Sequence, residues 1–439
     1  MSLDLLNAMN GKPCSCGKTH RFSAKVIVGC GVLQKLPAVV NEYGAKKVFV
    51  LSDGNTYKAA GEKVCSLLEA AGILWKGYSF PGETVEPDEQ SVGSAVMHMD
   101  ADSDLIVGVG SGVINDIGKI LSALSGKPYI IVATAPSMDG YASATSSMTR
   151  DGLKISLPSR GADVIIGDSE ILCNAPMKLL RSGLGDMLAK YISICEWRIA
   201  HLLIGEYYCE EIAGLVRYAV NQCVEHAEGL LNRDKDAVMA VFEGLIIGGV
   251  AMNYAGLSRP ASGVEHYISH VLDMRAVEFG TKAELHGLQC AVGTMIAAKL
   301  YEELRTVTPD RAKALNHAKT FDHAAWSDTL RAFLGKGAES MIALEAKEGK
   351  YDVALHAVRL EKLADNWNTI MEIVSQEIPA AEKLEALYAQ VGLPRTLADI
   401  GEAEELLPTV LRCTKDIRDK YVLSRMAWDL GIEKDLFGE

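Results

Sequence analysis

Two histidines one helical turn apart are the clearest candidates for metal chemistry in this chain. His266 and His270 are four residues apart, and a third histidine, His286, follows soon after them. On an α-helix, side chains at this spacing point to the same face, and imidazole nitrogens commonly bind divalent metal ions. Position 267 is Tyr, so the chain lacks the Glu of a metalloprotease helix. The spacing indicates a metal site of another kind, or an ordinary pair of histidines on one helix face.

A glycine-rich turn is the second candidate. Residues 104–110 are typical of a buried strand in a parallel sheet, and residues 113–125 of a helix. Between them, Gly110 and Gly112 would let the backbone approach a pyrophosphate, and the helix N-terminus offers N–H groups and a positive dipole end. The spacing differs from the strict G-x-G-x-x-G fingerprint. The pattern indicates a phosphate site or simply a tight turn.

Polar residues also follow two other expected strands, at the edge where open α/β sheets bind ligands. Asp53 ends a strand at 46–53. Its carboxylate would accept a hydrogen bond from a ribose 2′-hydroxyl, which favours NAD over NADP; the alternative is a turn-forming Asp. The loop after the strand at 129–134 is rich in hydroxyl groups that can bind phosphate or ribose. It contains Thr134, Ser137, Asp139 and Ser143, of which Asp139 is a candidate substrate or proton-relay group.

Two further segments carry possible metal ligands. Asp186 is expected at the start of a helix, where a carboxylate can also cap the helix or complement its dipole. Cys14, Cys16 and His20 could form part of a metal knuckle, but no second cluster of ligands follows them nearby in the sequence. We expect this segment to be a solvent-facing turn without a metal.

The composition excludes several classes of protein. The 439 residues are 49% hydrophobic and 23% charged, as in globular proteins, and are enough for two domains. A net charge of −13 without a basic run argues against nucleic acid as a partner. We see no apolar stretch of the roughly 20 residues that cross a bilayer and no signal-peptide pattern. Ten scattered cysteines indicate reduced thiols. These features predict a cytoplasmic protein without a membrane partner.

The order of the expected elements predicts two domains. Strands at 22–29, 46–53, 73–80, 104–110, 129–134 and 162–168 alternate with helices at 56–71, 87–99 and 113–125, which predicts βαβ units in a parallel sheet. After about residue 173, strand patterns vanish and long Ala-, Leu- and Glu-rich segments recur. We therefore predict an α/β domain over 1–172 and an all-helical domain over 173–439. In the polar region 305–378, His317, His323 and His356 are expected at the surface.

Taken together, these segments resemble the glycerol-1-phosphate dehydrogenase family, within the superfamily that also holds dehydroquinate synthase and the iron-dependent alcohol dehydrogenases. The resemblance covers most of residues 20–300, and in length it is closer to bacterial than to archaeal members. It implies a Rossmann-like nucleotide-binding domain, an all-α second domain of the dehydroquinate synthase type, and an active site in the cleft between them. The motifs that carry it are 108–116, Thr134 to Ser143, the Asp186 helix, Ser258 to His266 and Leu285-His286-Gly.

The resemblance also implies roles for individual residues. Asp186, His266 and His286 would bind one divalent metal ion, for which zinc, nickel and iron are all suitable. Asp139 and His270 would contact the substrate. Besides Asp53 and Gly110, the residues expected to contact NAD are Gly112, Val113, Ile114, Asn115, Asp116, Thr134, Ser137 and Ser143.

The implied reaction is the reduction of dihydroxyacetone phosphate to sn-glycerol 1-phosphate by NADH. The metal would act as a Lewis acid, and His270 or Asp139 would relay a proton. Two other reactions on the same scaffold stay open, namely a dehydroquinate-synthase-like cyclisation, for which the site segments hold few basic residues, and the oxidation of unphosphorylated glycerol. A binding protein without catalysis is the alternative from a different class, although all three expected ligands are present.

A phosphorylated triose substrate requires a cation in the site. Arg259 lies just upstream of the histidine pair, and a guanidinium matches the geometry of a phosphate. We therefore predict that Arg259 binds the substrate phosphate, with Lys154 and Arg160 as further candidates. The apolar faces of the helical tail could form a homodimer interface or belong to the core.

Overall fold

The structure, a computed structural model, describes residues 2–82 and 84–438 and divides into two compact units. Unit 1 comprises Met1–Met187 and Gly214–Gly256, and unit 2 comprises Leu188–Ala213 and Leu257–Glu439. Each unit therefore draws on two separate stretches of the chain, whereas the sequence suggested one break near residue 172.

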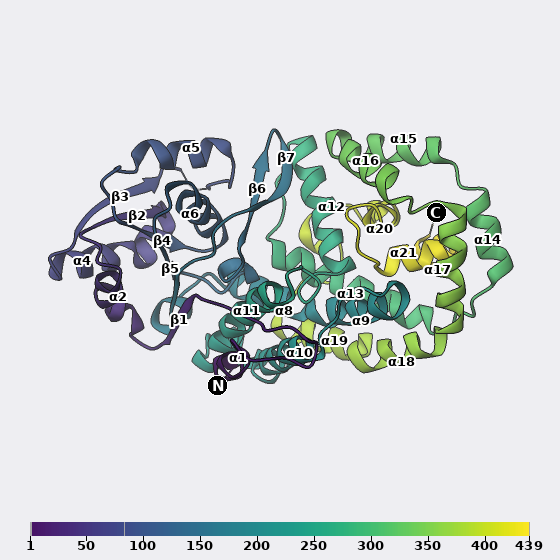
Figure 1. The fold of residues 1–439 in the computed structure, drawn as a ribbon, viewed down its shortest axis with the longest axis horizontal. Coiled ribbons are helices and arrows are strands. Elements are labelled where there is room, and N and C mark those ends of the chain that lie inside the picture. Colours follow the sequence, from purple (N-terminus) through teal and green to yellow (C-terminus); the bar gives the residue numbers. More distant parts are fainter. Residues whose placement is uncertain (1, 83, 439) are drawn as a thin grey trace. The chain divides into compact units, whose positions relative to one another are not determined.

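Unit 1 is built on a six-stranded sheet in which all paired strands are parallel (Figure 1). Its order is β1-β8-β5-β4-β2-β3. The central strands are fully buried runs of Val and Ile, as expected where helices cover both faces. All six predicted strands are confirmed, as β1 (Lys25–Gly29), β2 (Lys47–Asp53), β3 (Leu74–Phe80), β4 (Leu105–Gly110), β5 (Tyr129–Ala133) and β8 (Val164–Asp168).

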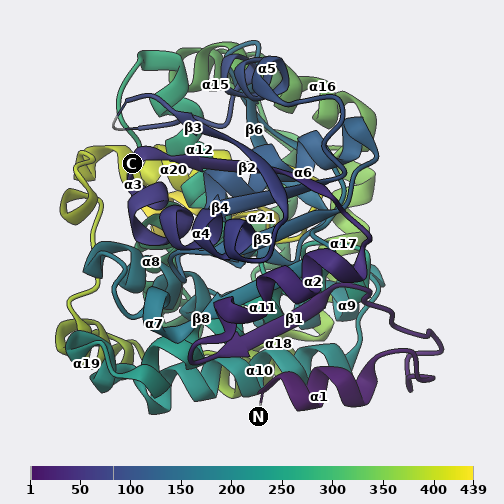
Figure 2. The same cartoon turned by 90° about the vertical axis from the view of Figure 1, so that its left-hand side faces the viewer.

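Helices cover the two faces of this sheet. On one face, α2 (Leu36–Glu42) and α4 (Glu62–Ala70) form an apolar core with alternate strand residues such as Val107 and Val109 (Figure 2). On the opposite face lie α6 (Gly112–Ser125) and α11 (Lys235–Ala255). Further helices of this part of the chain are α1 (Ser2–Met9), α3 (Gly54–Thr56), α5 (Glu89–His98), α7 (Ser169–Leu172) and α8 (Met177–Leu188).

A β-hairpin that the sequence analysis missed follows β5. Strands β6 (Thr145–Arg150) and β7 (Leu153–Pro158) pair in antiparallel fashion. Their two-residue turn, Asp151-Gly152, has φ values of 53° and 72°, so it belongs to the Asp-Gly turns that suit a hairpin. Strand β6 is polar except at Met148, so the pattern of hydrophobicity did not reveal it. Strand β7, Leu-Lys-Ile-Ser-Leu-Pro, does alternate apolar and polar residues and was overlooked.

Asp186 does not start a helix, contrary to the prediction. It lies in the last turn of α8, where Gly183 brings the helix against the loop after β5. A Cβ on Gly183 would collide with the Pro136 carbonyl oxygen. On the same helix, the Ser182 hydroxyl donates to the Ser137 carbonyl at 2.9 Å. The helix thus fixes the backbone of the hydroxyl-rich loop.

Helix α11 is longer and more apolar than the sequence analysis allowed for. Its 21 residues are long and apolar enough to cross a membrane, but 78% of its most apolar window is buried inside the structure. The helix packs onto the sheet through Phe242, whose ring occupies the space left by Gly167 in β8. Burial of this kind is typical of a core helix.

Unit 2 is helical throughout the part of it that the structure describes. Its elements are α9 (Lys190–Ile204), α12 (Val264–Phe279), α13 (His286–Leu304), α14 (Arg311–Lys319), α15 (His323–Leu334), α16 (Ala338–Glu348), α17 (Val353–Asp365), α18 (Trp367–Glu377), α19 (Ala381–Val391), α20 (Leu407–Thr414), α21 (Leu423–Asp429) and α22 (Glu433–Phe437), while α10 (Glu210–Glu225) spans both units. Many of their apolar faces are buried in the core.

One of the three histidines predicted at the surface of the region 305–378 is buried. His356 is 0% exposed, and its Nε2 lies 2.8 Å from the Asp429 carbonyl oxygen. His317 is half-buried against Trp428, whereas His323 is exposed. The prediction was wrong for His356 because the surrounding polar sequence gave no sign of a tertiary partner for this one ring.

Candidate active site

Three histidines meet on two neighbouring helices of unit 2. His266 and His270 lie on α12, and His286 is the first residue of α13. The ring centroids of His266 and His286 are 5.0 Å apart, and those of His270 and His286 are 6.3 Å apart. The predicted convergence of these imidazoles is therefore present within this unit.

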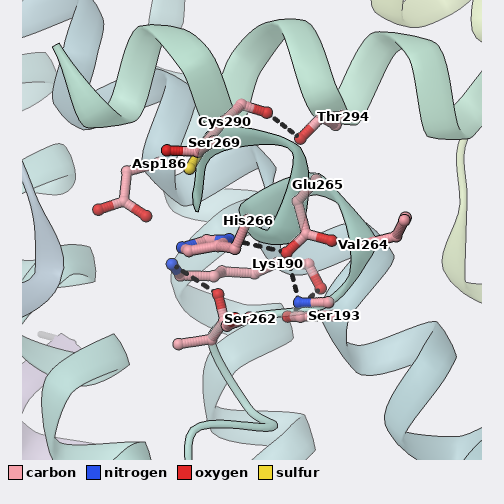
Figure 3. A network of polar contacts seen from close by, with 12 residues as sticks. Asp186, Lys190, Ser193, Ser262, Val264, Glu265, His266, Ser269, Cys290 and Thr294 are labelled. Carbon is pink, nitrogen blue, oxygen red and sulfur yellow. Dashed lines mark hydrogen bonds and ion pairs between the residues drawn. The ribbon is translucent and has the colours of Figure 1, made fainter. Parts of the chain in front are cut away.

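A buried carboxylate orients His266. The Nδ1 atom of His266 lies 2.8 Å from Oε1 of Glu265, which is 0% exposed (Figure 3). A carboxylate accepts a hydrogen bond, so Nδ1 carries the hydrogen and the lone pair of the neutral ring is on Nε2. Carboxylates placed in this way are common behind metal-binding histidines.

A serine hydroxyl orients His286 in a similar manner. The Ser269 hydroxyl donates its hydrogen to Oε1 of Gln289 at 2.6 Å, and its oxygen lies 3.0 Å from Nδ1 of His286. Because the hydroxyl has one hydrogen, it can only accept from His286. The lone pair of this ring is therefore also on Nε2, as metal binding requires.

A cysteine that the sequence analysis did not single out completes this cluster. Cys290 lies one turn after His286 on α13, is fully buried, and has its Sγ 3.6 Å from Nε2 of His286. Its Sγ and one nitrogen of each of His266 and His286 lie within 4.8 Å of one another. Burial raises the pKa of the thiol, but the two imidazoles outweigh it and lower the pKa. The His-x-x-x-Cys spacing was the sequence signal.

Glu196 is a second buried carboxylate, close to Glu265. Glu196 on α9 accepts hydrogen bonds from the backbone N–H of Leu423 at 2.7 Å and of Val264 at 2.9 Å, and from the Tyr301 hydroxyl at 3.1 Å. Gly263 is required there, because a Cβ would lie 2.5 Å from Oε2 of Glu196 and 2.7 Å from Oε2 of Glu265. Burial, followed by the charge of Glu265, raises the pKa of Glu196 to about 8. The pair therefore holds a proton at neutral pH.

This buried proton gives a testable dependence of stability on pH. The folded protein binds it up to about pH 8, whereas an unfolded Glu releases it near pH 4.5. Stability is therefore expected to fall as pH rises between these values, with a limiting slope of about 1.4 kcal/mol per pH unit. Glu196→Gln should remove this component of the slope in urea unfolding measured from pH 5 to 8.

Glu372→Gln is the matched control, because Glu372 is an exposed carboxylate of the same unit. It should not change the slope of the unfolding free energy against pH. Equal slopes for the unmodified chain and Glu196→Gln would show that Glu196 is ionised in the folded state.

The surroundings of Arg259 do not support the predicted role in phosphate binding. The side chain is 0% exposed, and both Nε and Nη2 donate to the Glu206 carboxylate, at 2.9 and 2.6 Å. Its Nη1 donates to the Tyr421 carbonyl at 2.9 Å. The guanidinium fork is thus occupied by a carboxylate, and Arg259 fixes the loop before α12.

Two other basic residues lie near the histidines. Lys420 is 9% exposed, and its Nζ donates to the carbonyl of Ser262, in the loop before the histidine helix α12, at 2.7 Å. Burial, followed by the charges of Arg259 and Arg418, lowers the pKa of Lys420 to about 7. Burial and then the charge of Arg418 hold the pKa of His270 well below its usual range, and Lys420 contributes to the same effect. These cations lie far from the histidines in the sequence, so no local motif indicated them.

In unit 1, the glycine turn and the hydroxyl-rich loop lie side by side. The hydroxyl groups of Ser111, between β4 and α6, and Ser137 are 2.5 Å apart. Gly110 cannot carry a side chain, because a Cβ would lie 2.5 Å from Cβ of Ile114. Gly112, by contrast, opens α6 at a position where a Cβ would meet only the flexible Met138 side chain at 3.4 Å. The N-terminus of α6 therefore lies beside the loop that carries Ser137.

Several predicted cofactor residues also have structural roles. The Asn115 side chain is buried and donates to the Gly140 carbonyl at 3.0 Å, and Asp116 pairs with Lys119 at 2.8 Å. Thr134 and Ser143 are buried, the latter bonded to Thr145 at 2.9 Å. Ile114 is buried in the core, while Val113 is half-buried. Contacts between these residues and NAD stay a prediction.

Asp53 and Asp139 each take part in hydrogen bonds within unit 1. Oδ1 of Asp53 caps α3 by accepting the N–H groups of Asn55 and Thr56 at 2.8 and 2.9 Å. The turn-forming role is therefore confirmed, and Oδ2 takes no part in it. Asp139 instead uses its backbone N–H, which donates to Oδ2 of Asp186 at 2.9 Å.

Comparisons with known proteins identify the family of this chain. Residues 27–176 match the profile of the family described as "Iron-containing alcohol dehydrogenase". A glycerol-1-phosphate dehydrogenase [NAD(P)+] of Bacillus licheniformis is 34% identical over 296 residues, which are 66% of this chain and 74% of that protein. The chain belongs to the glycerol-1-phosphate dehydrogenase family. A glycerol-1-phosphate dehydrogenase [NAD(P)+] of Methanosarcina mazei is 35% identical, over 65% of this chain and 78% of that protein.

Solved structures establish the fold class of this family member. The glycerol dehydrogenase of Schizosaccharomyces pombe has a TM-score of 0.59 at 18% identity, covering 95% of this chain and 91% of that one. For the NADH-dependent butanol dehydrogenase A of Thermotoga maritima the TM-score is 0.58 at 17% identity, covering 96% and 98%. The predicted fold, a parallel α/β domain followed by a large helical part, is confirmed. An NAD(P) cofactor and a metal ion are consistent with the names of these relatives and of the matching family.

Proposed function

We propose that this member of the family uses NADH to reduce dihydroxyacetone phosphate to sn-glycerol 1-phosphate. The observation that carries the proposal is the pair of histidines His266 and His286. Each commits Nδ1 to a fixed acceptor, so each presents an Nε2 lone pair beside a lowered-pKa thiol. A donor set of this kind suits a divalent metal ion better than it suits any structural role.

We assign Asp186 as the third metal ligand. Its Oδ2 accepts the N–H of Asp139, and this bond holds the carboxylate in place. Zinc, nickel and iron all accept two imidazoles and a carboxylate, and Cys290 is close enough to tune the site electronically. When bound, a divalent ion supplies Lewis acidity that polarises the substrate carbonyl.

The nucleotide would bind at the carboxyl edge of the unit 1 sheet. The α6 N-terminus, with Gly110 and Gly112, would receive the pyrophosphate. Ser111 and Ser137 are candidate donors to the phosphates or ribose, since their hydroxyl groups already meet there. Oδ2 of Asp53 is the atom proposed to bind a ribose hydroxyl. NADH supplies the hydride, which adds to the carbonyl carbon of the substrate.

The remaining groups would bind the phosphate and deliver a proton. We assign the substrate phosphate to Lys420 and Arg418, the two cations that act on His270. His270 is neutral at pH 7, so it can pass a proton from water to the carbonyl oxygen without carrying a fixed charge. Asp139 is the alternative relay group. Together these residues hold the phosphorylated triose with its ketone next to the metal ligands.

A spectrophotometric assay of NADH consumption tests the proposal. The purified chain, supplied in turn with zinc, nickel or iron, should oxidise NADH with dihydroxyacetone phosphate and far more slowly with dihydroxyacetone. Equal rates with both ketones would indicate a glycerol dehydrogenase. An absence of net NADH turnover with every metal would contradict an oxidoreductase and favour a cyclase or a binding protein. A cytoplasmic location and a homodimeric state belong to the same proposal.

A further inference from the structure

A second group of metal-binding side chains lies outside the proposed active site, in the segment before β1. The chain at Cys14-Ser15-Cys16-Gly17-Lys18-Thr19-His20 forms a tight loop. The Cys14 N–H donates to the Lys18 carbonyl at 2.9 Å, and the Gly17 N–H donates to the Cys14 carbonyl at 3.0 Å. Gly17 has a φ of 82°, which a residue with a side chain rarely adopts. This loop turns Cys14 and Cys16 toward the same side as His20.

The three side chains converge. Sγ of Cys16 lies 3.4 Å from Nε2 of His20, and the ligand atoms of Cys14, Cys16 and His20 lie within 4.8 Å of one another. No disulfide forms among the cysteines of the described residues, although Cys14 and Cys16 are this close. The sequence analysis expected a solvent-facing turn, but His20 is only 3% exposed.

The ring of His20 is oriented as in a metal ligand. Its Nδ1 lies 3.0 Å from the Tyr254 carbonyl oxygen, which can only accept, so Nδ1 carries the hydrogen. The ring also stacks on Tyr254, with centroids 5.4 Å apart. In the neutral ring the lone pair is then on Nε2, the atom that faces Cys16. A backbone carbonyl behind a histidine is a common arrangement at zinc sites.

We propose that Cys14, Cys16 and His20 bind a zinc ion that stabilises the structure rather than taking part in catalysis. Structural zinc sites are tetrahedral and take thiolate and imidazole ligands. Cys14, Cys16 and His20 supply three such ligands within unit 1. Two thiolates favour zinc over the harder ions.

The zinc would hold the segment before β1 against α11. Tyr254, which orients His20, is near the C-terminal end of α11, and its hydroxyl donates to the Leu6 carbonyl in α1 at 3.4 Å. Asn10 and Phe22 close the intervening loop through two bonds, of 2.8 and 2.9 Å. These contacts fix both ends of the segment, and the metal would fix its middle.

Zinc content and zinc–sulfur coordination test the proposal without measuring activity. The chain is purified with zinc, treated with EDTA to remove loosely bound metal, and analysed by mass spectrometry and zinc X-ray absorption. We expect about one retained zinc with Zn–S distances of about 2.3 Å. Cys14→Ser/Cys16→Ser should lose that zinc, whereas His266→Ala/His286→Ala should keep it. Retention of the same zinc and sulfur signal in Cys14→Ser/Cys16→Ser would overturn the proposal.

The double variant could fail to fold, so a second measurement uses the unmodified chain. With zinc bound, Cys14 and Cys16 should resist alkylation, and removal of zinc by a strong chelator should expose both, as read by peptide mass spectrometry. Cys30 is exposed and serves as the internal control, with equal labelling in both states. Equal labelling of Cys14 and Cys16 in both states would contradict a zinc site.

Discussion

Replacement of His266 with Ala is expected to lower kcat/KM for the reduction of dihydroxyacetone phosphate by about 10³-fold or more. Loss of one preorganised group that stabilises developing oxyanion charge already lowers kcat by about 10²–10³-fold. This variant removes a proposed metal ligand whose orientation is fixed by Glu265. Occupancy of the proposed catalytic metal should fall as well. Steady-state kinetics with added metal and metal analysis of the dialysed protein measure the two effects.

His323→Ala is the matched control, because His323 is exposed at the start of α15 in the same unit. It removes an imidazole of the same size and should leave both kcat/KM and metal content within about twofold of the unmodified chain, as for a surface substitution. If His266→Ala retains full activity at saturating metal, His266 is not a ligand and the proposed site is wrong.

Replacement of Lys420 with Met is expected to raise KM for dihydroxyacetone phosphate by about 10–100-fold. A charged hydrogen bond to a phosphate contributes about 1.5–3 kcal/mol, and Met preserves most of the buried aliphatic volume of Lys. The rate with unphosphorylated dihydroxyacetone should not change. Because the pKa of Lys420 is lowered to about 7 by burial and then by Arg259, KM in the unmodified chain should also rise as pH increases above 7.

Lys383→Met removes the same charge from an exposed position on α19 and is the control for a change in overall charge. It should not alter KM. An equal loss of activity toward both ketones in Lys420→Met would show that Lys420 only holds the Ser262 carbonyl. The phosphate would then have to be bound by Arg418 or by another cation.

The elements that carry a repeating pattern could be predicted from the sequence. The inner strands β2, β4, β5 and β8 are short apolar runs that end at or just before Gly, Asp or Thr, as is typical of strands buried on both faces. The histidine pair was found because helical spacing alone puts His266 and His270 on one face. In these cases the information is local, within one turn or one strand.

The residues that were missed depend on contacts between distant segments. Arg259 has the right type and place for a phosphate ligand, but its partner Glu206 lies 53 residues away in the sequence. Lys420 reaches the loop before the histidine helix from the other end of the unit. His20 is oriented by a carbonyl 234 residues away. No local pattern encodes such pairs, so the sequence identified the metal-binding residue types without their surroundings.

The single hydrogen of the Ser269 hydroxyl affects how the proposed catalytic site binds its metal ion. Since that hydrogen is directed to Gln289 and the hydroxyl oxygen receives the Nδ1 hydrogen of His286, the imidazole has no tautomer to exchange when an ion arrives. Glu265 accepts the Nδ1 hydrogen of His266 and fixes the tautomer of that ring in the same way. In its neutral form, each ring therefore presents the Nε2 lone pair to an incoming ion without any exchange of tautomer.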